Sequence, residues 1–275
     1  MTVGIVGLGL IGGSFAKAYH EAGATVLAWN RSRSVLDFAI MSGAVDAELT
    51  EDNIAACDLV LIALYPEATI EWFRRMAPHI GAHPVVLDCG GTKRTICAAC
   101  FPIAKEHGVT FLGGHPMAGT QYSGFKNAKA TMYHGAPMVI VPPDFDDVLL
   151  FDHVKQLLQP AGFARFSFTT AEAHDEMIAF TSQLAHVVSS AYIKSPEADK
   201  HNGYSAGSYK DLTRVAKLNE TMWSELFLCN AEPLAAEIDE IIKHLDEYRR
   251  AIRAGDRETL TELLREGRIR KENLG

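Results

Sequence analysis

His115 lies in the stretch of sequence whose residue types are best suited to chemistry. It belongs to the run Gly113-Gly-His-Pro-Met-Ala-Gly119, which directly follows a predicted strand. Pro116 restricts His115 to extended conformations, and the flanking glycines clear space around its ring. An imidazole at a strand end can take a hydroxyl proton while hydride leaves the same carbon. Although a loop histidine is often structural, this setting favours a catalytic base.

Two further stretches carry groups suited to an anionic substrate. Lys210 and Arg214 lie one turn apart on a predicted helix, so both can face one way and bind a carboxylate, or both can be solvated. His186 lies in a segment with no charged residue between Glu176 and Lys194. It is either a core histidine with a hydrogen-bond partner or a neutral donor facing the substrate.

The run Asp88-Cys-Gly-Gly-Thr-Lys93 follows another predicted strand, at the edge where open α/β sheets bind ligands. Gly90 and Gly91 permit close approach of the backbone, and Lys93 can orient substrate or cofactor. The alternative is an ordinary strand-to-helix turn.

A glycine motif near the N-terminus predicts a bound dinucleotide. Gly7, Gly9 and Gly12 stand between an apolar strand and a helix, with a second strand following. In such a motif the glycines permit a tight turn, close approach of a pyrophosphate and close packing of the helix, and the helix N-terminus favours phosphates. A flexible glycine loop is the alternative. The expected cofactor contacts are Gly7, Leu8, Gly9, Leu10, Ile11, Gly12, Asn30, Arg31, Ser32, Arg33 and Leu64.

The end of the second strand bears on which dinucleotide is bound. An acid there usually binds the ribose 2′-hydroxyl of NAD, whereas arginine suits the 2′-phosphate of NADP. The chain reads Trp29-Asn-Arg-Ser-Arg33, with two guanidinium groups, a hydroxyl and no acid. This favours NADP over NAD, with solvated arginines at a helix start as the alternative.

Alternating strands and helices must position these groups. Strands are predicted over 3–6, 24–29, 58–64, 85–88, 109–112, 138–141 and 163–167, and helices over 66–79, 94–107 and 146–158. Repeated β-α-β units predict a Rossmann-type, doubly wound, mostly parallel sheet over residues 1–168. The run 58–64 is apolar nearly throughout, as in a strand covered on both faces.

The remaining residues, 169–275, predict an all-helical C-terminal domain. Because a soluble helix without charges must be buried all round, the segment between Glu176 and Lys194 is expected to run through its middle. A helix over 233–254 carries an apolar stripe that suits either a partner subunit or the interior of one chain. Gly255 is expected to end it, and a short charged helix to follow.

Composition indicates a soluble globular protein. The chain has 275 residues, a length sufficient for two domains. Of these residues, 48% are hydrophobic and 22% are charged. A net charge of -8 without a long basic run argues against nucleic acid as a partner. No secretory signal or membrane span is expected, and five cysteines without framework spacing indicate a cytoplasmic protein. Cys97-x-x-Cys100 lacks a second ligand pair, so no metal is expected.

These motifs resemble the prephenate/arogenate dehydrogenase family of tyrosine biosynthesis over nearly the whole chain. The first motif is shared by many dehydrogenases, whereas GGHPMAG combined with the later lysine-to-arginine stretch is more specific. The resemblance rests on Gly7 to Gly13, Asp88 to Lys93, Gly113 to Gly119, Ser182 to His186, Tyr209 to Arg214 and Met222-Trp223.

The resemblance implies oxidative decarboxylation of prephenate, a dicarboxylate, to 4-hydroxyphenylpyruvate with hydride transfer to NAD(P)+, in a homodimer that pairs through the helical domain. His115 then polarises or deprotonates the ring hydroxyl. Arogenate, with an amine in place of the pyruvyl ketone, is the alternative substrate, and the neutral Gln121 favours prephenate. The implied catalytic residues are His115, Lys93 and Thr92, and the implied substrate contacts are His186, Arg214, Lys210, Gln121 and Thr120.

Two positions depart from the family pattern. Many members carry a serine two residues before Lys93, which hydrogen-bonds the catalytic histidine and the substrate hydroxyl; here Gly91 stands there, so water or Thr92 must substitute. Many also read Ser-His-Leu-Pro-His where this chain has Ser-Gln-Leu-Ala-His186. The chain ends without room for a regulatory domain, so any inhibition by tyrosine is expected at the active site.

Two other classes share parts of the pattern. Pyrroline-5-carboxylate reductases and β-hydroxyacid dehydrogenases have a similar fold and length, but they do not explain GGHPMAG or the Lys210–Arg214 helix. A dinucleotide-sensing protein without turnover is compatible with the missing serine, but it has no need of both His115 and Arg214.

Overall fold

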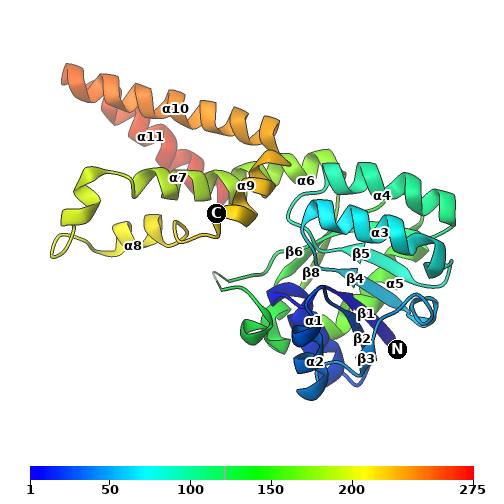
Figure 1. The fold of residues 1–275 in the computed structure, drawn as a ribbon. Helices are drawn as coiled ribbons and strands as arrows, with labels where there is room; N and C mark the ends of the chain where they lie inside the picture. The colour runs from blue at the N-terminus through cyan, green and yellow to red at the C-terminus, as the bar shows by residue number, and fades with distance from the viewer. Residues whose placement is uncertain (121) are drawn as a thin grey trace.

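A computed structural model describes residues 1–120 and 122–275, and Gln121, expected among the substrate contacts, lies outside the described residues. Within them, eight strands form one sheet, and a helical region follows (Figure 1). The strands are β1 (Thr2–Val6), β2 (Thr25–Trp29), β3 (Ala47–Glu48), β4 (Leu59–Ile62), β5 (Val85–Asp88), β6 (Thr110–Pro116), β7 (Pro137–Val141) and β8 (Arg165–Phe168). The helices beside the sheet are α1 (Leu10–Glu21), α2 (Arg33–Met41), α3 (Pro66–Ile80), α4 (Arg94–His107) and α5 (Val148–Leu158).

The strand order is β3-β2-β1-β4-β5-β6-β7-β8, and every pair is parallel except β6–β7. The chain winds outward in one direction from β1 to β3 and then in the other from β4. Ligands of open α/β sheets bind at the carboxyl ends of the strands where the order reverses. The predicted doubly wound, mostly parallel sheet is therefore confirmed, and its ligand edge lies beside β1 and β4.

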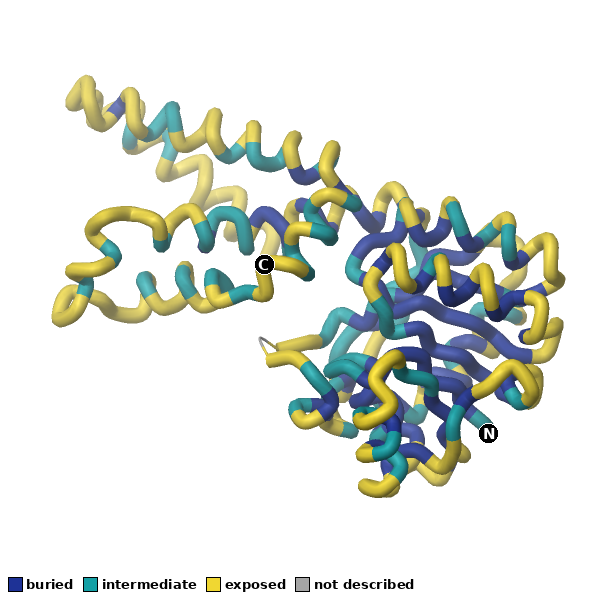
Figure 2. The backbone as a smooth tube through the Cα atoms, in the orientation of Figure 1, coloured by how far each residue is buried: buried dark blue, intermediate teal, exposed yellow. Residues whose placement is uncertain are grey.

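Helices cover both faces of the sheet, as the apolar run over 58–64 predicts. Along β4, Leu59 and Leu61 pack with α1, α2 and α5, whereas Val60 and Ile62 pack with α3 and α4. All four side chains are fully buried, and the buried strands stand out in Figure 2. Burial on both faces fixes the register of the strand, and with it the turns at its carboxyl end.

The sequence places His115 just after a strand, and this is wrong in one respect. The predicted strand ends at residue 112, whereas β6 continues through Pro116. The extension arises because β7 pairs antiparallel with Gly113 to Pro116, with His115 opposite Val139. His115 is therefore held by strand pairing rather than by a loop.

The helical region begins with α6 (Ala171–Ile178), a π-helical turn (Ala179–Gln183) and α7 (Leu184–Tyr192). The expectation that this uncharged segment is buried all round is wrong for the single chain, because Met177 and Phe180 are each 58% exposed. Helix α10 packs against only part of its surface. The segment therefore leaves an apolar face uncovered.

Four more helices complete the described chain, namely α8 (Gly207–Thr213), α9 (Glu220–Leu228), α10 (Ala231–Ala254) and α11 (Arg257–Leu274). Gly255 ends α10 with φ 65°, the left-handed conformation that favours glycine, as predicted. The last helix has 18 residues and is not short. In the part of the chain that the structure describes, every helix is too short or too polar to cross a membrane.

Candidate active site

The glycine motif forms a tight loop between β1 and α1. Gly7 has φ 91°, and a Cβ atom there would lie 2.6 Å from the Ala63 carbonyl oxygen. A Cβ atom on Gly12 would lie 1.8 Å from the Gly7 oxygen. By contrast, a Cβ atom on Gly9 would meet no atom within 4 Å. Gly7 and Gly12 are thus needed for packing, whereas Gly9 faces open space at the N-terminus of α1, where a pyrophosphate can approach.

Asn30 and Leu64 hold this loop from its two sides. The Asn30 side-chain oxygen accepts a hydrogen bond from the Leu8 backbone N–H at 2.9 Å, and its amide donates to the Ser32 carbonyl oxygen at 3.0 Å. The Leu64 side chain packs against Gly7, where a Cβ atom would be 2.7 Å from it. Asn30 therefore shapes the loop and engages one of the loop's backbone donors.

The two arginines after β2 differ in their surroundings. Arg33 donates to Asp37 at 2.8 Å and to Glu48 at 2.5 Å. Arg31 is exposed and makes no salt bridge within residues 1–120 and 122–275. The Ser32 hydroxyl lies 3.0 Å from that of Ser34. Arg31 is thus the arginine available to an anion at this end of the sheet, because Arg33 already has two carboxylate partners.

The turn after β5 is built around the buried Asp88 carboxylate. It accepts hydrogen bonds from the backbone N–H of Gly90 at 2.8 Å and of Gly114 at 3.1 Å, and from the Lys93 ammonium. The side chains of Asp88 and Lys93 are fully buried. Lys93 thus points into the protein, where its charge stabilises the turn and faces β6, rather than toward an open surface.

Gly91 and Thr92 leave room in this turn. A Cβ atom on Gly91 would make only ordinary contacts, at 3.5 and 3.7 Å, with the Leu226 methyl groups. The Thr92 hydroxyl is buried and has no hydrogen-bond partner among the described residues. A serine would therefore fit at position 91, and the Thr92 hydroxyl is able to form a hydrogen bond with a ligand.

His115 is partly buried and belongs to a chain of hydrogen bonds. Its Nδ1 lies 2.9 Å from His174 Nε2, and His174 Nδ1 lies 2.7 Å from Asp175 Oδ1. The pKa of His115 is well below its ordinary value, because of burial and, to a smaller extent, the charges of His174 and Lys93. The imidazole is therefore neutral at pH 7 and able to accept a proton.

No motif or spacing singles out His174 or Asp175 in the sequence. They lie on α6, 59 and 60 residues beyond His115 along the chain. The one available signal is a His-Asp pair four residues after Thr170, whose hydroxyl caps α6 by accepting from Ala173 N at 3.2 Å. Only the tertiary fold brings this pair to β6.

A second group forms around His186 on α7. Its ring stacks on Trp223, with centroids 3.8 Å apart, and its Nδ1 donates to the Ser182 carbonyl oxygen at 2.9 Å. Burial lowers the pKa of His186, and the nearby Arg214 charge lowers it further, against an opposing effect of the Ser182 hydrogen bond. The Arg214 charge therefore lies near the His186 ring, whose Nε2 has no hydrogen-bond partner among the described residues.

Helix α9 connects the two groups, since it carries both Trp223 beside His186 and Leu226 beside Gly91. Lys210 is exposed on α8. Thr120 is exposed after β6, where its hydroxyl accepts from the backbone N–H of Tyr122 at 3.3 Å. The structure thus clusters His115, Lys93 and Thr92 at the sheet edge and His186 with Arg214 on the helices, with Lys210 and Thr120 at the periphery.

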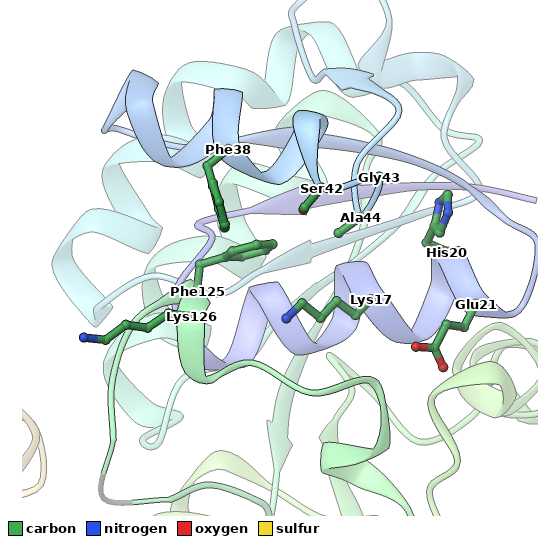
Figure 3. Close-up of a pocket in the computed structure, with 9 residues that line it drawn as sticks. All are labelled: Lys17, His20, Glu21, Phe38, Ser42, Gly43, Ala44, Phe125 and Lys126. Atoms are coloured by element: carbon green, nitrogen blue, oxygen red, sulfur yellow. The ribbon is translucent and has the colours of Figure 1, made fainter.

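A separate hollow of about 480 Å³ lies between α1, α2 and the turn at 125–127 (Figure 3). None of the expected site residues lines it. Its lining residues are Lys17, His20, Glu21, Phe38, Ser42, Gly43, Ala44, Phe125 and Lys126.

The sheet order and the glycine loop are those of a dinucleotide-binding protein, with a histidine at the carboxyl edge of the sheet. Comparison of the sequence with known families identifies one family within that class. Residues 15–166 match the family described as "Prephenate dehydrogenase, nucleotide-binding domain", and residues 170–266 match "Prephenate dehydrogenase, dimerization domain". The chain belongs to the prephenate dehydrogenase family, as its motifs predict.

Characterised relatives agree with this assignment. The chain is 29% identical to a cyclohexadienyl dehydrogenase of Zymomonas mobilis, over 96% of this chain and 92% of that one. It is 27% identical to a prephenate dehydrogenase of Bacillus subtilis, over 94% and 72% of the two chains. The crystal structure of an Aquifex aeolicus prephenate dehydrogenase with hydroxyphenyl propionate and NAD+ is similar, with a TM-score of 0.82, 26% identity, and coverage of 100% and 98%.

Proposed function

We propose that this chain is a prephenate dehydrogenase, which converts prephenate to 4-hydroxyphenylpyruvate and CO2 in tyrosine biosynthesis. The observation that carries the proposal is the neutral His115 imidazole, which lies at the ligand edge of the sheet and is held by His174. A base that is neutral at working pH can take the ring hydroxyl proton. Arogenate is the alternative substrate of the same chemistry.

The chain's residues divide the work between the two groups. His115 accepts the hydroxyl proton, and the Thr92 hydroxyl supplies the hydrogen bond that the family serine makes elsewhere. Arg214 binds a substrate carboxylate, which is a charge-assisted contact, and His186 offers Nε2 to the same substrate. Lys210 and Thr120, both exposed, are proposed as further substrate contacts, as is Gln121 from its place in the sequence. Lys93 supports the turn from its buried pair with Asp88.

The open space at Gly9 and the N-terminus of α1 fit a dinucleotide pyrophosphate. When bound, the nicotinamide ring accepts the hydride. We propose NADP+ as the preferred form, because Arg31 is exposed and the Ser32 hydroxyl lies beside it along the chain. Arg33 contributes less than its position in the sequence indicates, since Asp37 and Glu48 bind it.

We propose two domains, over residues 1–168 and 169–275, and a homodimer formed through the second. The description of the matched C-terminal family as a dimerization domain supports this. So does the apolar surface left exposed by Met177, Phe180, Ile242 and Leu245. Light scattering on the purified chain should give twice 30.1 kDa, and Leu245→Glu should shift the mass toward one chain.

The function is tested by a rate assay that offers prephenate or arogenate, each with NAD+ or NADP+, to the folded protein. We expect turnover with prephenate, faster with NADP+. His115→Asn is the sharpest variant, because its amide can still donate to His174 while the Nε2 base is deleted. It should reduce kcat about 10²–10⁴-fold.

His153→Asn, at an exposed position on α5, is the matched control and should leave kcat unchanged. Faster turnover with arogenate would reassign the substrate. No turnover with any pair of substrate and cofactor, from folded protein, would overturn the proposal and favour a dinucleotide-sensing protein.

A further inference from the structure

We propose that His174 and Asp175 are positioning residues, which hold His115 in the tautomer that carries its proton on Nδ1 and leaves Nε2 as the base. The inference rests on the proposed role of His115. It deepens that role by assigning the atom that takes the proton and the residues, on a different element, that select it.

The direction of the hydrogen bonds is fixed from the Asp175 end. Its carboxylate oxygens accept from the backbone N–H of Lys93 at 2.7 Å and of Arg94 at 2.9 Å. A carboxylate in this setting only accepts, so His174 Nδ1, 2.7 Å from Oδ1, must carry a hydrogen and donate it.

The same reasoning passes through the His174 ring to His115. A neutral imidazole that donates from Nδ1 can only accept at Nε2. His174 Nε2 lies 2.9 Å from His115 Nδ1, so with His174 in its neutral form His115 Nδ1 is the donor. The remaining nitrogen of His115, Nε2, then holds a lone pair. The hydrogen bond made by one ring nitrogen sets the state of the other.

Burial makes this arrangement rigid. His174 is 3% exposed and Asp175 is fully buried, so bulk water does not compete for either group. Asp175 also binds the first N–H groups of α4, which lack partners inside that helix. Its own carbonyl oxygen accepts from the Asn230 amide at 2.8 Å, and that amide also donates to Gln183 Oε1 at 2.8 Å.

The consequence is that β6 carries the base but α6 selects its tautomer. Asp175 ties α6 to α4 on one side and to the start of α10 on the other. The charged groups around the hydrogen-bonded chain of His115, His174 and Asp175 are the Asp88–Lys93 pair beside His115 and the Asp175 carboxylate itself. Neither Asp88 nor Lys93 hydrogen-bonds the His115 ring in the described residues, so His174 is the ring's partner.

The first test is spectroscopic and needs no turnover. Long-range ¹H–¹⁵N correlation spectra of the full chain, labelled at its 11 histidines, distinguish protonated from unprotonated ring nitrogens. The His115→Asn and His174→Gln variants identify the two rings by loss of their signals. We expect protonated Nδ1 and bare Nε2 on both His115 and His174. A His115 ring protonated on Nε2 would overturn the proposal.

The second test separates positioning from mere packing. His174→Leu removes the acceptor and should lower kcat about 10²-fold, as for loss of a general base, with KM for prephenate unchanged. His174→Gln places a side-chain oxygen where it can accept from His115 Nδ1, and it should restore most of the rate. Equal loss in both variants, or a loss confined to KM, would contradict positioning.

The spectroscopic result distinguishes this proposal from the function itself. If the native protein has the expected tautomers but turns over none of the offered substrates, the proposed function fails and the positioning role stands. If the protein turns over prephenate while His115 carries its proton on Nε2, the function stands and the positioning role fails.

Discussion

Replacing Gly9 with alanine should weaken cofactor binding without harming the fold. Gly9 has a negative φ of -80° in an extended conformation, and its added Cβ would meet no atom within 4 Å. Alanine at a compatible position stabilises by about 0.4–1 kcal/mol, because it reduces the entropy of the unfolded chain. The free Gly9→Ala protein should therefore melt at the native temperature or slightly above.

The same methyl group occupies the space through which a pyrophosphate approaches the N-terminus of α1. Losing one charge-assisted hydrogen bond costs about 1.5–3 kcal/mol, which corresponds to an increase in Kd of about 10- to 150-fold. Calorimetric titration with NAD+ and NADP+ measures this directly, and a melting curve of the same sample without cofactor measures stability.

Two further glycines serve as controls. Gly267→Ala, on the exposed helix α11, should stabilise by about 1 kcal/mol and leave Kd unchanged. Gly12→Ala should prevent folding of the loop, since its Cβ would lie 1.8 Å from the Gly7 oxygen. A Gly9→Ala protein that binds cofactor with the native Kd, or that loses stability, would refute the assignment of this loop.

Three other predictions concern the remaining parts of the site. Gly91→Ser should fold normally, because only Leu226 methyl groups lie near the new Cβ. Its kcat with prephenate should rise if the hydroxyl supports His115. A fall in both kcat and melting temperature would contradict this. Arg31→Ala should raise KM for NADP+ about 10-fold, which corresponds to about 1.4 kcal/mol. Arg33→Ala should raise this KM less. The reverse order would show that Arg33 leaves its carboxylate partners to bind the phosphate. Burial lowers the pKa of His115. The value of kcat/KM should therefore stay high below pH 6.5 and fall only as the pH drops through the lowered pKa. A fall centred at or above the ordinary histidine pKa would count against His115 as a buried base.

Patterns local in sequence predict much of this fold. The strand over 85–88 and the helix over 94–107 are found at the predicted residues, because apolar runs and helix ends are local features. The extension of β6 to Pro116 depends on pairing with β7. The residue pattern of one strand does not indicate which strand will pair with it. Similarly, β3 has only two residues, too few for any periodicity.

The site is harder to predict than the fold, because its key contacts join distant segments. Arg33 reads as a phosphate ligand until Glu48 on β3 is placed beside it, 15 residues away. Lys93 reads as an open cation until the fold buries it against Asp88. His174 has no recognisable motif, and only tertiary packing brings it to His115. Residue type and spacing therefore indicate which groups can do chemistry, and the fold decides which of them have other partners.

Residues 125–133 pack against α1 before the chain enters β7. Tyr133 donates from its hydroxyl to the Ile11 carbonyl oxygen at 2.6 Å, and the Lys129 N–H donates to the Ser14 hydroxyl at 3.1 Å. Two contacts from the residues before β7 thus reach the first turns of the helix beside the cofactor loop. The strand that pairs with His115 is therefore anchored to the helix beside the cofactor loop, whereas Arg214 directly follows α8 in the helical region.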